Sequence, residues 1–327
     1  MLGLDKLKDH ICVTETKVEC PVKGCDEWVD RQRRRDYKRD ERFKCPAHNI
    51  YISPTTFEYS DYRDNLLWKE PTDLCLLKRI KSVKRENRIS WDNSEDAVSW
   101  NVFRFLEKNN MIHEFLRLIN SLTFNSPEII YWGYNQKEHI PKNYGWSRLN
   151  EARKEFGETI RRGSEPDIII ETNDSLCFIE AKLTSNNETK PSNKSVKINY
   201  LNGGDKWFSE VFRSSYETVA ITEKKYELMR FWLLGTWMAK QQGLNFYLVN
   251  LVLSECEKDI ELRFRWNIRE NEKKKFFRIT WEDIFRQILS RNSSGRDKDL
   301  VLDYFRNKTL GYDKNGNLRK AFSLPQF

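Results

Sequence analysis

Two short apolar runs flank a polar turn near the middle of the chain. Residues 167–171 read Asp-Ile-Ile-Ile-Glu, and residues 176–179 read Leu-Cys-Phe-Ile. Between them, residues 172–175 read Thr-Asn-Asp-Ser, which are residue types that favour tight turns. A brief apolar run on each side of such a turn is typical of a β-hairpin. We therefore predict two strands joined by a tight turn over residues 167–182.

The hydrophobic pattern also predicts the elements on either side of this hairpin. Helices are expected at residues 94–106, 112–122, 148–161, 223–242, 279–289 and 297–308, and strands at residues 50–59, 128–133, 246–253 and 260–268. Ser94 (or Asn93) and Thr280 are the expected caps of two helices. The tail from Gly311 is expected to be basic and loop-like. Residues 183–197 are polar, and we expect either a mobile lip that orders on substrate or a plain disordered insertion.

The predicted hairpin carries acidic side chains near both of its open ends. Because side chains alternate along a strand, Asp167 shares a face with Glu171, and Glu180 shares a face with Lys182. Carboxylates that converge in this way suit a hard divalent cation, which prefers oxygen ligands. An exposed hairpin with ordinary charged edges is the alternative.

The residues Pro166-Asp167, followed after twelve residues by Glu180-Ala181-Lys182, resemble the motif of the PD-(D/E)XK nuclease superfamily. The resemblance covers roughly residues 91–290. It implies an α/β fold of the restriction-endonuclease-like class, with an α-β-β-β-α-β core and helices flanking a central mixed sheet. The predicted order of elements from Ser94 to Leu253 agrees with that core.

The resemblance also implies roles for individual residues. Asp167 and Glu180 would hold Mg²⁺ (or Mn²⁺), and Lys182 would orient the attacking water and stabilise negative charge. A helix ahead of the core strands often supplies another acid in this superfamily, and Glu95 matches that position best. The alternative for Glu95 is a favourable interaction with the helix dipole.

A second group of metal-binding residue types lies near the N-terminus. Cys20 and Cys25 form one pair, and Cys45 and His48 form another. Two such knuckles can close a tetrahedral zinc site that has a structural role. His10 or Cys12 could replace one ligand, and free cysteines in a loop-rich segment are the alternative to a metal site.

Basic residues are concentrated between these two knuckles, from Arg31 to Lys44, and are interrupted by acidic ones. One interpretation is a surface that contacts phosphate groups. The other is a solvated face with internal ion pairs. Arg161 and Arg162 raise the same choice between phosphate contacts and charges at a helix end.

Composition places limits on these hypotheses. The 327 residues have a formal net charge of +8, which suits a polyanionic partner, and no apolar run approaches a membrane span. Seven cysteines, several of them in apolar segments, favour a reducing cytoplasm. We expect three parts: a zinc-finger-like module at residues 1–60, a connector at residues 61–90, and a nuclease-like domain with a C-terminal helical extension at residues 91–327.

The leading hypothesis is a Mg²⁺-dependent endonuclease that hydrolyses phosphodiester bonds of DNA. A role in restriction or another prokaryotic defence system fits by family analogy alone. A homodimer would allow both strands to be cut. Two alternatives remain at this point: a DNA-binding protein whose nuclease fold is catalytically silent, and a module whose zinc finger recognises a protein partner.

Overall fold

The computed structural model describes residues 1–33, 39–84, 88–119, 127–138, 145–159, 163–192, 197–291 and 295–325. Arg161 and Arg162, and the basic residues at positions 34, 35 and 38, lie outside this part of the chain. The chain divides into two compact units. Unit 1 comprises Met1–Glu70, Arg88–Phe105 and Ile284–Phe327, and unit 2 comprises Pro71–Asn87 and Leu106–Asp283. This division differs from the three predicted parts, because unit 1 takes residues from both ends of the chain.

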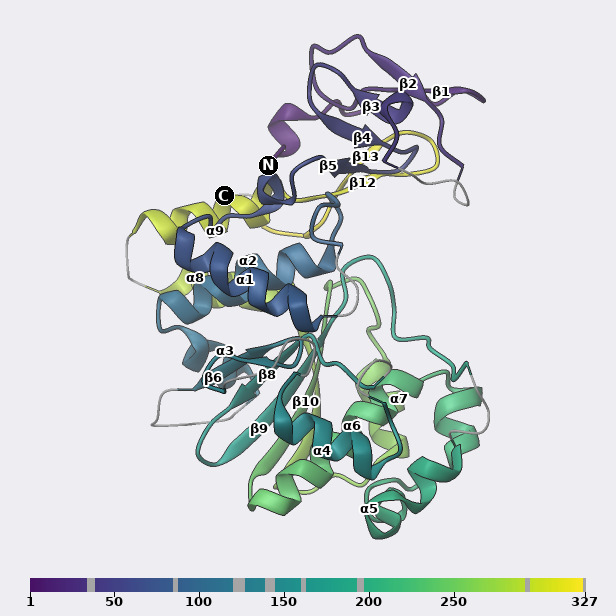
Figure 1. Ribbon diagram of the computed structural model, residues 1–327, viewed down its shortest axis with the longest axis vertical. Coiled ribbons are helices and arrows are strands. Elements are labelled where there is room, and N and C mark those ends of the chain that lie inside the picture. Colours follow the sequence, from purple (N-terminus) through teal and green to yellow (C-terminus); the bar gives the residue numbers. More distant parts are fainter. Residues whose placement is uncertain are drawn as a thin grey trace. The chain divides into compact units, whose positions relative to one another are not determined.

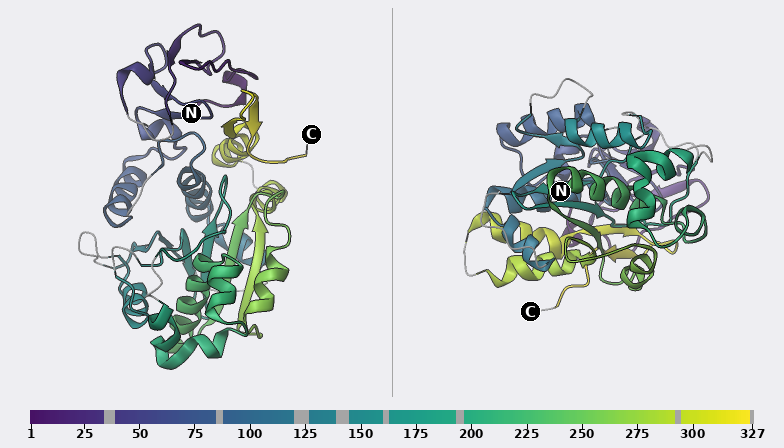
Figure 2. Two further views of the ribbon diagram at one scale, coloured as in Figure 1. Left: turned by 90° about the vertical axis from the view of Figure 1, so that its right-hand side faces the viewer. Right: turned by 90° about the horizontal axis from the view of Figure 1, so that it is seen from below.

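Unit 2 contains a central mixed sheet, as predicted. Its strands are β6 (Glu128–Tyr131), β7 (Tyr134–Asn135), β8 (Ile168–Glu171), β9 (Ser175–Ala181), β10 (Asn245–Val252) and β11 (Lys274–Thr280). They lie side by side in the order β11-β10-β9-β8-β6-β7 (Figure 1; Figure 2, left). The pairs β6–β8 and β8–β9 are antiparallel, whereas β9–β10 and β10–β11 are parallel. A parallel pair needs a crossover connection, and α6 supplies it between β9 and β10.

Helices of unit 2 cover this sheet. They are α1 (Pro71–Val83), α3 (Ile112–Leu118), α4 (Ser147–Glu155), α5 (Lys197–Val211), α6 (Tyr226–Gln242) and α7 (Ile260–Asn267), with a π-helical segment at Glu217–Thr222. The apolar helix α6 packs against β9 and β10, and α4 and α5 pack against α6 (Figure 1). Non-helical backbone interrupts α5 at residues 203–206. The core of unit 2 lies between α6 and the sheet and includes Trp232, Phe178 and Phe246.

Unit 1 holds the Cys-His module, which we define as residues 1–60. Its strands are β1 (Lys17–Glu19), β2 (Trp28–Asp30), β3 (Lys44–Cys45), β4 (Ile50–Ile52) and β5 (Phe57–Tyr59), and 3-10 turns lie at Leu4–Lys6, Glu41–Phe43 and Tyr62–Asn65. Also in unit 1 are α9 (Arg296–Asn307), β12 (Thr309–Tyr312) and β13 (Leu318–Lys320). Helices α2 (Glu95–Lys108) and α8 (Trp281–Ser290) each cross the boundary between the units along the chain.

Two predicted helix caps are confirmed. The Ser94 hydroxyl accepts a hydrogen bond from the Ala97 N–H at 3.1 Å, at the start of α2. Thr280 Oγ1 accepts from the Asp283 N–H at 3.0 Å, and the Asp283 carboxylate accepts from the Thr280 N–H at 2.9 Å. This reciprocal capping box explains why α8 begins immediately after β11 ends.

The predicted strand at residues 260–268 is wrong, because this segment forms α7. Its apolar residues alternate, which suits a strand, but Ile260 and Phe264 are also four residues apart and share one face of a helix. That face is buried, whereas Leu262 and Trp266 are 75% and 77% exposed. The edge position beside β10 is occupied instead by β11, which the pattern did not predict.

Within residues 61–90, α1 buries Leu77 and Ile80 and begins at Pro71, a favourable first helical residue. One other expectation needs correction. The tail from Gly311 is not simply a loop, since β12 and β13 pair as an antiparallel hairpin. Among the described residues, no helix is long and apolar enough to cross a membrane.

Candidate functional site

The predicted hairpin is confirmed as β8 and β9. The strands are antiparallel, with Ile168 opposite Ile179 and Glu171 opposite Leu176. In the turn, Thr172 Oγ1 accepts a hydrogen bond from the Ser175 N–H at 3.0 Å, as expected for a Thr at this position. Because the strands are antiparallel, the start of β8 and the end of β9 lie at the same end of the hairpin, opposite its turn. Asp167, Glu180 and Lys182 therefore belong to this open end.

Hydrogen bonds to Asp167 show how closely the two strand ends approach. Its Oδ2 atom accepts from the Ala181 N–H at 2.9 Å, between the other two candidate residues. Its Oδ1 atom accepts from Trp132 Nε1 at 3.0 Å. The backbone and an indole thus orient the Asp167 carboxylate.

Lys182 lies between two carboxylates. Its ammonium forms an ion pair with Glu180, and its Nζ atom is 3.4 Å from Glu227 Oε2. The three motif residues, Asp167, Glu180 and Lys182, all belong to unit 2, and the structure brings them together. Two further residues, Glu227 and Trp132, lie beside them. Sequence reasoning missed both additions. Glu227 stands in the first turn of α6, where an acid is expected for dipole reasons alone, so its position gave no separate signal.

Trp132 reaches Asp167 from an unusual backbone conformation. Trp132 and Gly133 form the two-residue turn between β6 and β7, and their φ angles are +46° and +73°. A two-residue hairpin turn with both φ angles positive is normally occupied by Asn, Asp or Gly. A bulky residue is strained there, and such strain is concentrated at functional sites. The Trp132 N–H also donates to the Asp167 carbonyl at 3.0 Å, which fixes this turn against β8.

The electrostatics of the site favour a cation. Glu180 is 4% exposed, and burial is the main cause that raises its pKa well above the usual range. The carboxylates of Asp167 and Glu227 raise this pKa further, whereas Lys182 lowers it. A divalent cation would relieve the same repulsion.

Glu95 is the first residue of α2 and lies in unit 1, whereas the hairpin lies in unit 2. Its role as a further ligand therefore stays a prediction. Glu171, which shares a face with Asp167 in the predicted hairpin, forms an ion pair with Arg148. On α6, Arg230 pairs with the buried Glu158, at 2.8 Å between Nε and Oε1.

The four predicted zinc ligands lie together in the Cys-His module. The ligand atoms of Cys20, Cys25, Cys45 and His48 are all within 4.8 Å of one another, close enough to bind a metal such as zinc. In the described part of the chain, no other group of three or more His, Cys, Asp or Glu residues gathers in this way. Cys12 is exposed, and His10 Nε2 is 3.0 Å from the Asn315 carbonyl oxygen, so neither alternative ligand belongs to the cluster.

The distances in this cluster fit a tetrahedral zinc ion. Zn–S and Zn–N bonds of about 2.3 and 2.0–2.1 Å place two sulfur ligands ~3.8 Å apart and a sulfur and a nitrogen ~3.5 Å apart. Cys25 Sγ and Cys45 Sγ are 3.8 Å apart, and Cys45 Sγ is 3.5 Å from His48 Nδ1. Cys20 Sγ is 3.8 Å from the same nitrogen. The first knuckle turns at Gly24, whose φ of +75° favours glycine.

Burial raises the pKa values of the Cys20 and Cys45 thiols. Zinc requires thiolates, so a bound ion would supply the positive charge that keeps these sulfur atoms deprotonated.

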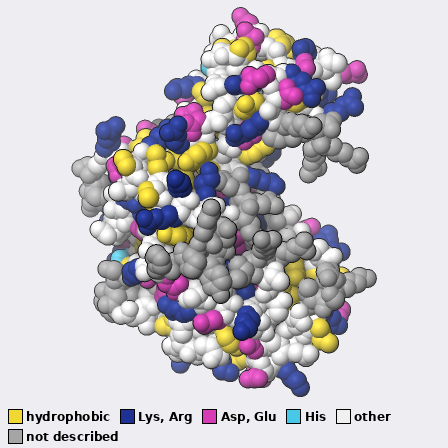
Figure 3. All heavy atoms as spheres, in the orientation of Figure 1, with side chains coloured by type: hydrophobic (Ala, Val, Ile, Leu, Met, Phe, Trp, Pro, Cys, Tyr) yellow, Lys and Arg dark blue, Asp and Glu magenta, His cyan; other side chains and the backbone are white. Residues whose placement is uncertain are grey.

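Several basic residues of the Cys-His module have acidic partners. Lys17 pairs with Asp30 at 2.7 Å and Lys44 with Glu41 at 3.3 Å, and Arg39 pairs with the buried Glu58. On the face of the module shown in Figure 3, Lys and Arg side chains are interspersed with Asp and Glu side chains. These pairs favour the solvated-face interpretation for the described residues of the basic segment.

Comparison with known proteins gives no match: no protein-family model, no curated protein and no solved structure resembles this chain significantly.

Proposed function

We propose that the chain is a Mg²⁺-dependent endonuclease that hydrolyses phosphodiester bonds of DNA. The observation that carries this proposal is the arrangement of charged side chains at the open end of the β8–β9 hairpin. There the Asp167 carboxylate is bound by the Ala181 N–H, and Glu180 and Lys182 lie on either side of Ala181 in the sequence. Two carboxylates and one ammonium at the ends of neighbouring strands suit metal-assisted phosphoryl transfer.

Asp167 and Glu180 would hold the ion, and Glu95 is proposed as a further ligand. Bound Mg²⁺, or Mn²⁺ in its place, would lower the pKa of a coordinated water and neutralise charge at the scissile phosphate. Trp132 and the Ala181 N–H orient the Asp167 carboxylate.

Without the ion, a lysine beside two carboxylates stays protonated, because opposite charges favour the charged form of an amine. The ammonium of Lys182 therefore acts electrostatically, by orienting the attacking water and by stabilising negative charge that develops on the phosphate.

The choice of DNA as substrate rests on the superfamily resemblance and on the net charge of +8. A homodimer would present two such sites to the two strands of a duplex. A place in restriction or another prokaryotic defence system is inferred by fold analogy.

The proposal is tested by incubating supercoiled plasmid with the protein and Mg²⁺. Asp167→Ala, Glu180→Ala and Lys182→Ala are each expected to slow cleavage by about a hundredfold or more, since each removes a charge that acts in the transition state. Glu188→Ala is the matched control, because Glu188 is exposed and lies on the segment after Lys182. It should cleave at the wild-type rate.

Cleavage that survives all three substitutions would remove the assignment. Titration calorimetry with Mg²⁺ or Mn²⁺ is a second test. Heat of binding by the wild type that Glu180→Ala loses supports a metal site, whereas a catalytically silent fold should bind no divalent ion. Single-stranded DNA and RNA, tested beside the plasmid, decide the substrate class.

A further inference from the structure

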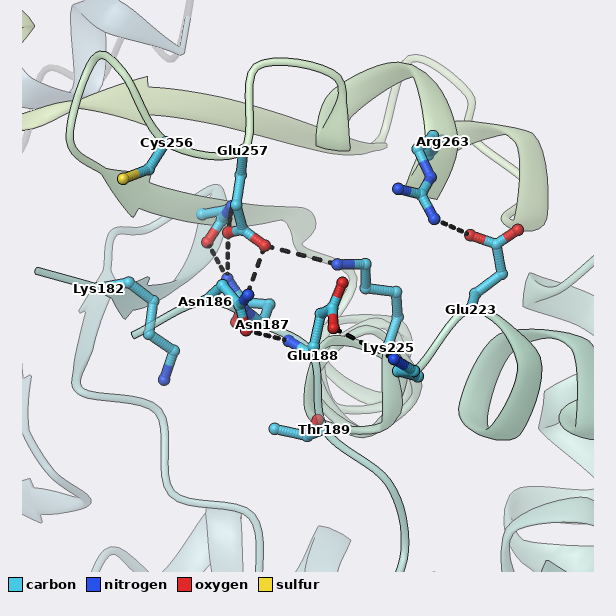
Figure 4. A network of polar contacts seen from close by, with 12 residues as sticks. Lys182, Asn186, Asn187, Glu188, Thr189, Glu223, Lys225, Cys256, Glu257 and Arg263 are labelled. Carbon is cyan, nitrogen blue, oxygen red and sulfur yellow. Dashed lines mark hydrogen bonds and ion pairs between the residues drawn. The ribbon is translucent and has the colours of Figure 1, made fainter. Parts of the chain in front are cut away.

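A buried polar network holds the segment that follows Lys182. Asn187 in this segment is fully buried, and its Nδ2 atom donates to Asn250 Oδ1 and to Glu257 Oε2, both at 2.7 Å (Figure 4). Its backbone N–H donates to Glu257 Oε1 at 3.0 Å. Lys225 lies 3.5 Å from the same carboxylate. We call these four residues, Asn187, Asn250, Lys225 and Glu257, the Asn187 network.

The Asn187 network contains two features that are unfavourable for the free energy of folding. Glu257 has a φ of +46°, in the left-handed region that residues other than glycine rarely adopt. Asn187 Oδ1 is buried without a hydrogen-bond partner in the described structure. Strained backbone and incompletely satisfied buried polar groups persist where the surrounding structure holds them for a purpose. Their presence indicates a role beyond closing a surface loop.

One end of the network is fastened to β10, the strand next to the one that carries Glu180. Asn250 is the register partner of Glu180 in the parallel pair β9–β10. Side chains of directly paired residues project from the same face of a sheet. The Asn187 network and the Glu180 carboxylate therefore share that face on neighbouring strands.

The other end is fastened to the first turn of α6. Thr189 donates its N–H to the Lys224 carbonyl at 2.7 Å, and its Oγ1 atom accepts from the Glu227 N–H at 2.9 Å. Glu227 is the residue whose carboxylate lies 3.4 Å from Lys182 Nζ. The segment after Lys182 is thus bonded to Asn250, the register partner of Glu180, and to the backbone of Glu227.

We propose that Asn187, Glu257 and Thr189 are positioning residues that hold the Lys182 ammonium between Glu180 and Glu227. The inference rests on the proposed function, because it matters to catalysis only if Lys182 acts on a phosphate. A lysine side chain has four rotatable carbons and turns readily toward solvent. Fixing the backbone of Glu227, the strand beside Glu180 and the chain that follows Lys182 restricts that freedom before substrate arrives, which is preorganisation.

The first test measures the lysine itself and does not depend on nuclease activity. The full-length protein is treated briefly with a small acylating reagent, and the modification of each lysine is quantified by mass spectrometry. Asn187→Ala should raise the labelling rate of Lys182 by about tenfold, because loss of buried hydrogen bonds increases local opening. Asn186→Ala is the matched control, since Asn186 is the exposed neighbour of the same type. Lys258, an exposed lysine, should react equally in all proteins.

Thr189→Val provides a second variant in case Asn187→Ala does not fold, since it removes only the hydroxyl that accepts from Glu227. Unchanged Lys182 labelling in a folded Asn187→Ala or Thr189→Val protein would overturn the proposal. A rise that is equal for Lys182 and Lys108, whose side chain is only 19% exposed in the same unit, would also overturn it, because that pattern indicates general unfolding.

The second test uses DNA cleavage. Asn187→Ala should lower kcat by about tenfold or more with little change in KM, as expected when a catalytic group is displaced without loss of substrate contacts. Asn186→Ala should keep the wild-type kcat. An unchanged kcat in an active Asn187→Ala protein contradicts the inference. A wild-type protein that cleaves no nucleic acid would instead count against the proposed function, and the labelling result would still decide whether the network positions Lys182.

Discussion

At the scale of single residues, this protein keeps ionised groups buried by giving them several partners. Glu158 is the clearest case, with a side chain that is 3% exposed. Its carboxylate accepts from Arg230 Nε, Tyr200 OH and Ser164 Oγ, each at 2.8 Å. Burial alone would raise its pKa, but Arg230 and the bonds from Ser164 outweigh burial and lower the pKa below its ordinary value of 4.5. Ser164 lies three residues before Asp167, so Glu158 also fixes the approach to the candidate site.

Glu158→Gln should destabilise the protein by about 3 kcal/mol at pH 7, because it leaves the Arg230 guanidinium buried without its counter-charge. The folded-state pKa of Glu158 is depressed, so its stabilising contribution is present above the unfolded-state value and is lost as pH falls through the folded-state pKa. The difference between variant and wild type should therefore shrink as the pH falls below the ordinary glutamate pKa of 4.5. Chemical denaturation at pH 7 and at lower pH measures it.

Glu151→Gln on the exposed face of α4 serves as the control and should have little effect at either pH. A destabilisation by Glu158→Gln that is equal at both pH values would show that the charge of Glu158 is not what stabilises the fold.

At the scale of elements, the C-terminal hairpin completes the Cys-His module. Tyr312 on β12 belongs to the same buried cluster as Cys20, Cys25 and Cys45. Its hydroxyl donates to the Lys8 carbonyl at 2.9 Å, and its N–H donates to the Thr55 carbonyl at 2.7 Å. The module has few apolar residues, so the metal site and the hairpin each supply part of a small core.

Removal of the metal with a chelator should therefore loosen β12 and β13 as well as the knuckles, because binding energy at a structural zinc site is folding energy. Hydrogen exchange followed by mass spectrometry measures this. Peptides that contain Tyr312 and Leu318 are expected to lose protection after chelation, and readdition of Zn²⁺ should restore it.

Peptides from β9 and β10 are the internal control, since these strands form the centre of the other unit's sheet. A hairpin that keeps its protection while residues 20–48 lose theirs would show that the metal and the hairpin are energetically independent.

At the scale of the whole molecule, charge governs the expected interaction with DNA. The net charge of +8 favours a polyanion, but many cations of the Cys-His module already have acidic partners. Affinity for DNA should then come from a limited number of phosphate contacts. For about six contacts, affinity is expected to fall by roughly a thousandfold between 50 and 200 mM salt.

Fluorescence anisotropy with labelled duplex and the Glu180→Ala variant, which is expected not to cut the probe, measures this dependence. A duplex of unrelated sequence should show a similar slope of log affinity against log salt concentration, because phosphate contacts do not depend on base sequence. Binding that is insensitive to salt would argue against phosphate contacts and would favour the alternative in which the zinc finger recognises a protein.

Local signals account for the parts of the fold that were predicted correctly. The β8–β9 hairpin follows from turn residues between two apolar runs, and the caps at Ser94 and Thr280 follow from side chains that bond within three residues. The Cys-His cluster follows from two short ligand pairs. In each case the signal lies in residue types at short spacings, such as the turn residues, the capping residues and the two members of each ligand pair.

The errors arose where local patterns were compatible with more than one structure. Residues 260–267 suit both a strand and a helix, and packing of Ile260 and Phe264 selected the helix. The strands β12 and β13 are short and depend on bonds to residues near the N-terminus, such as that from Leu318 N–H to the Asp9 carbonyl at 2.8 Å. The sequence of residues 309–320 contains no pattern that indicates hydrogen bonds to residues about three hundred positions earlier.

The candidate site shows the same division. The sequence by itself determined which chemical groups are present: Asp167, Glu180 and Lys182 on a hairpin, and four soft ligands in two knuckles. Only the tertiary structure decided that Trp132 and Glu227 join the first group and that Asn187 fastens the chain beside it. The physical reason is that convergence of side chains depends on strand register and helix packing, which are set by burial of the whole core rather than by neighbouring residues.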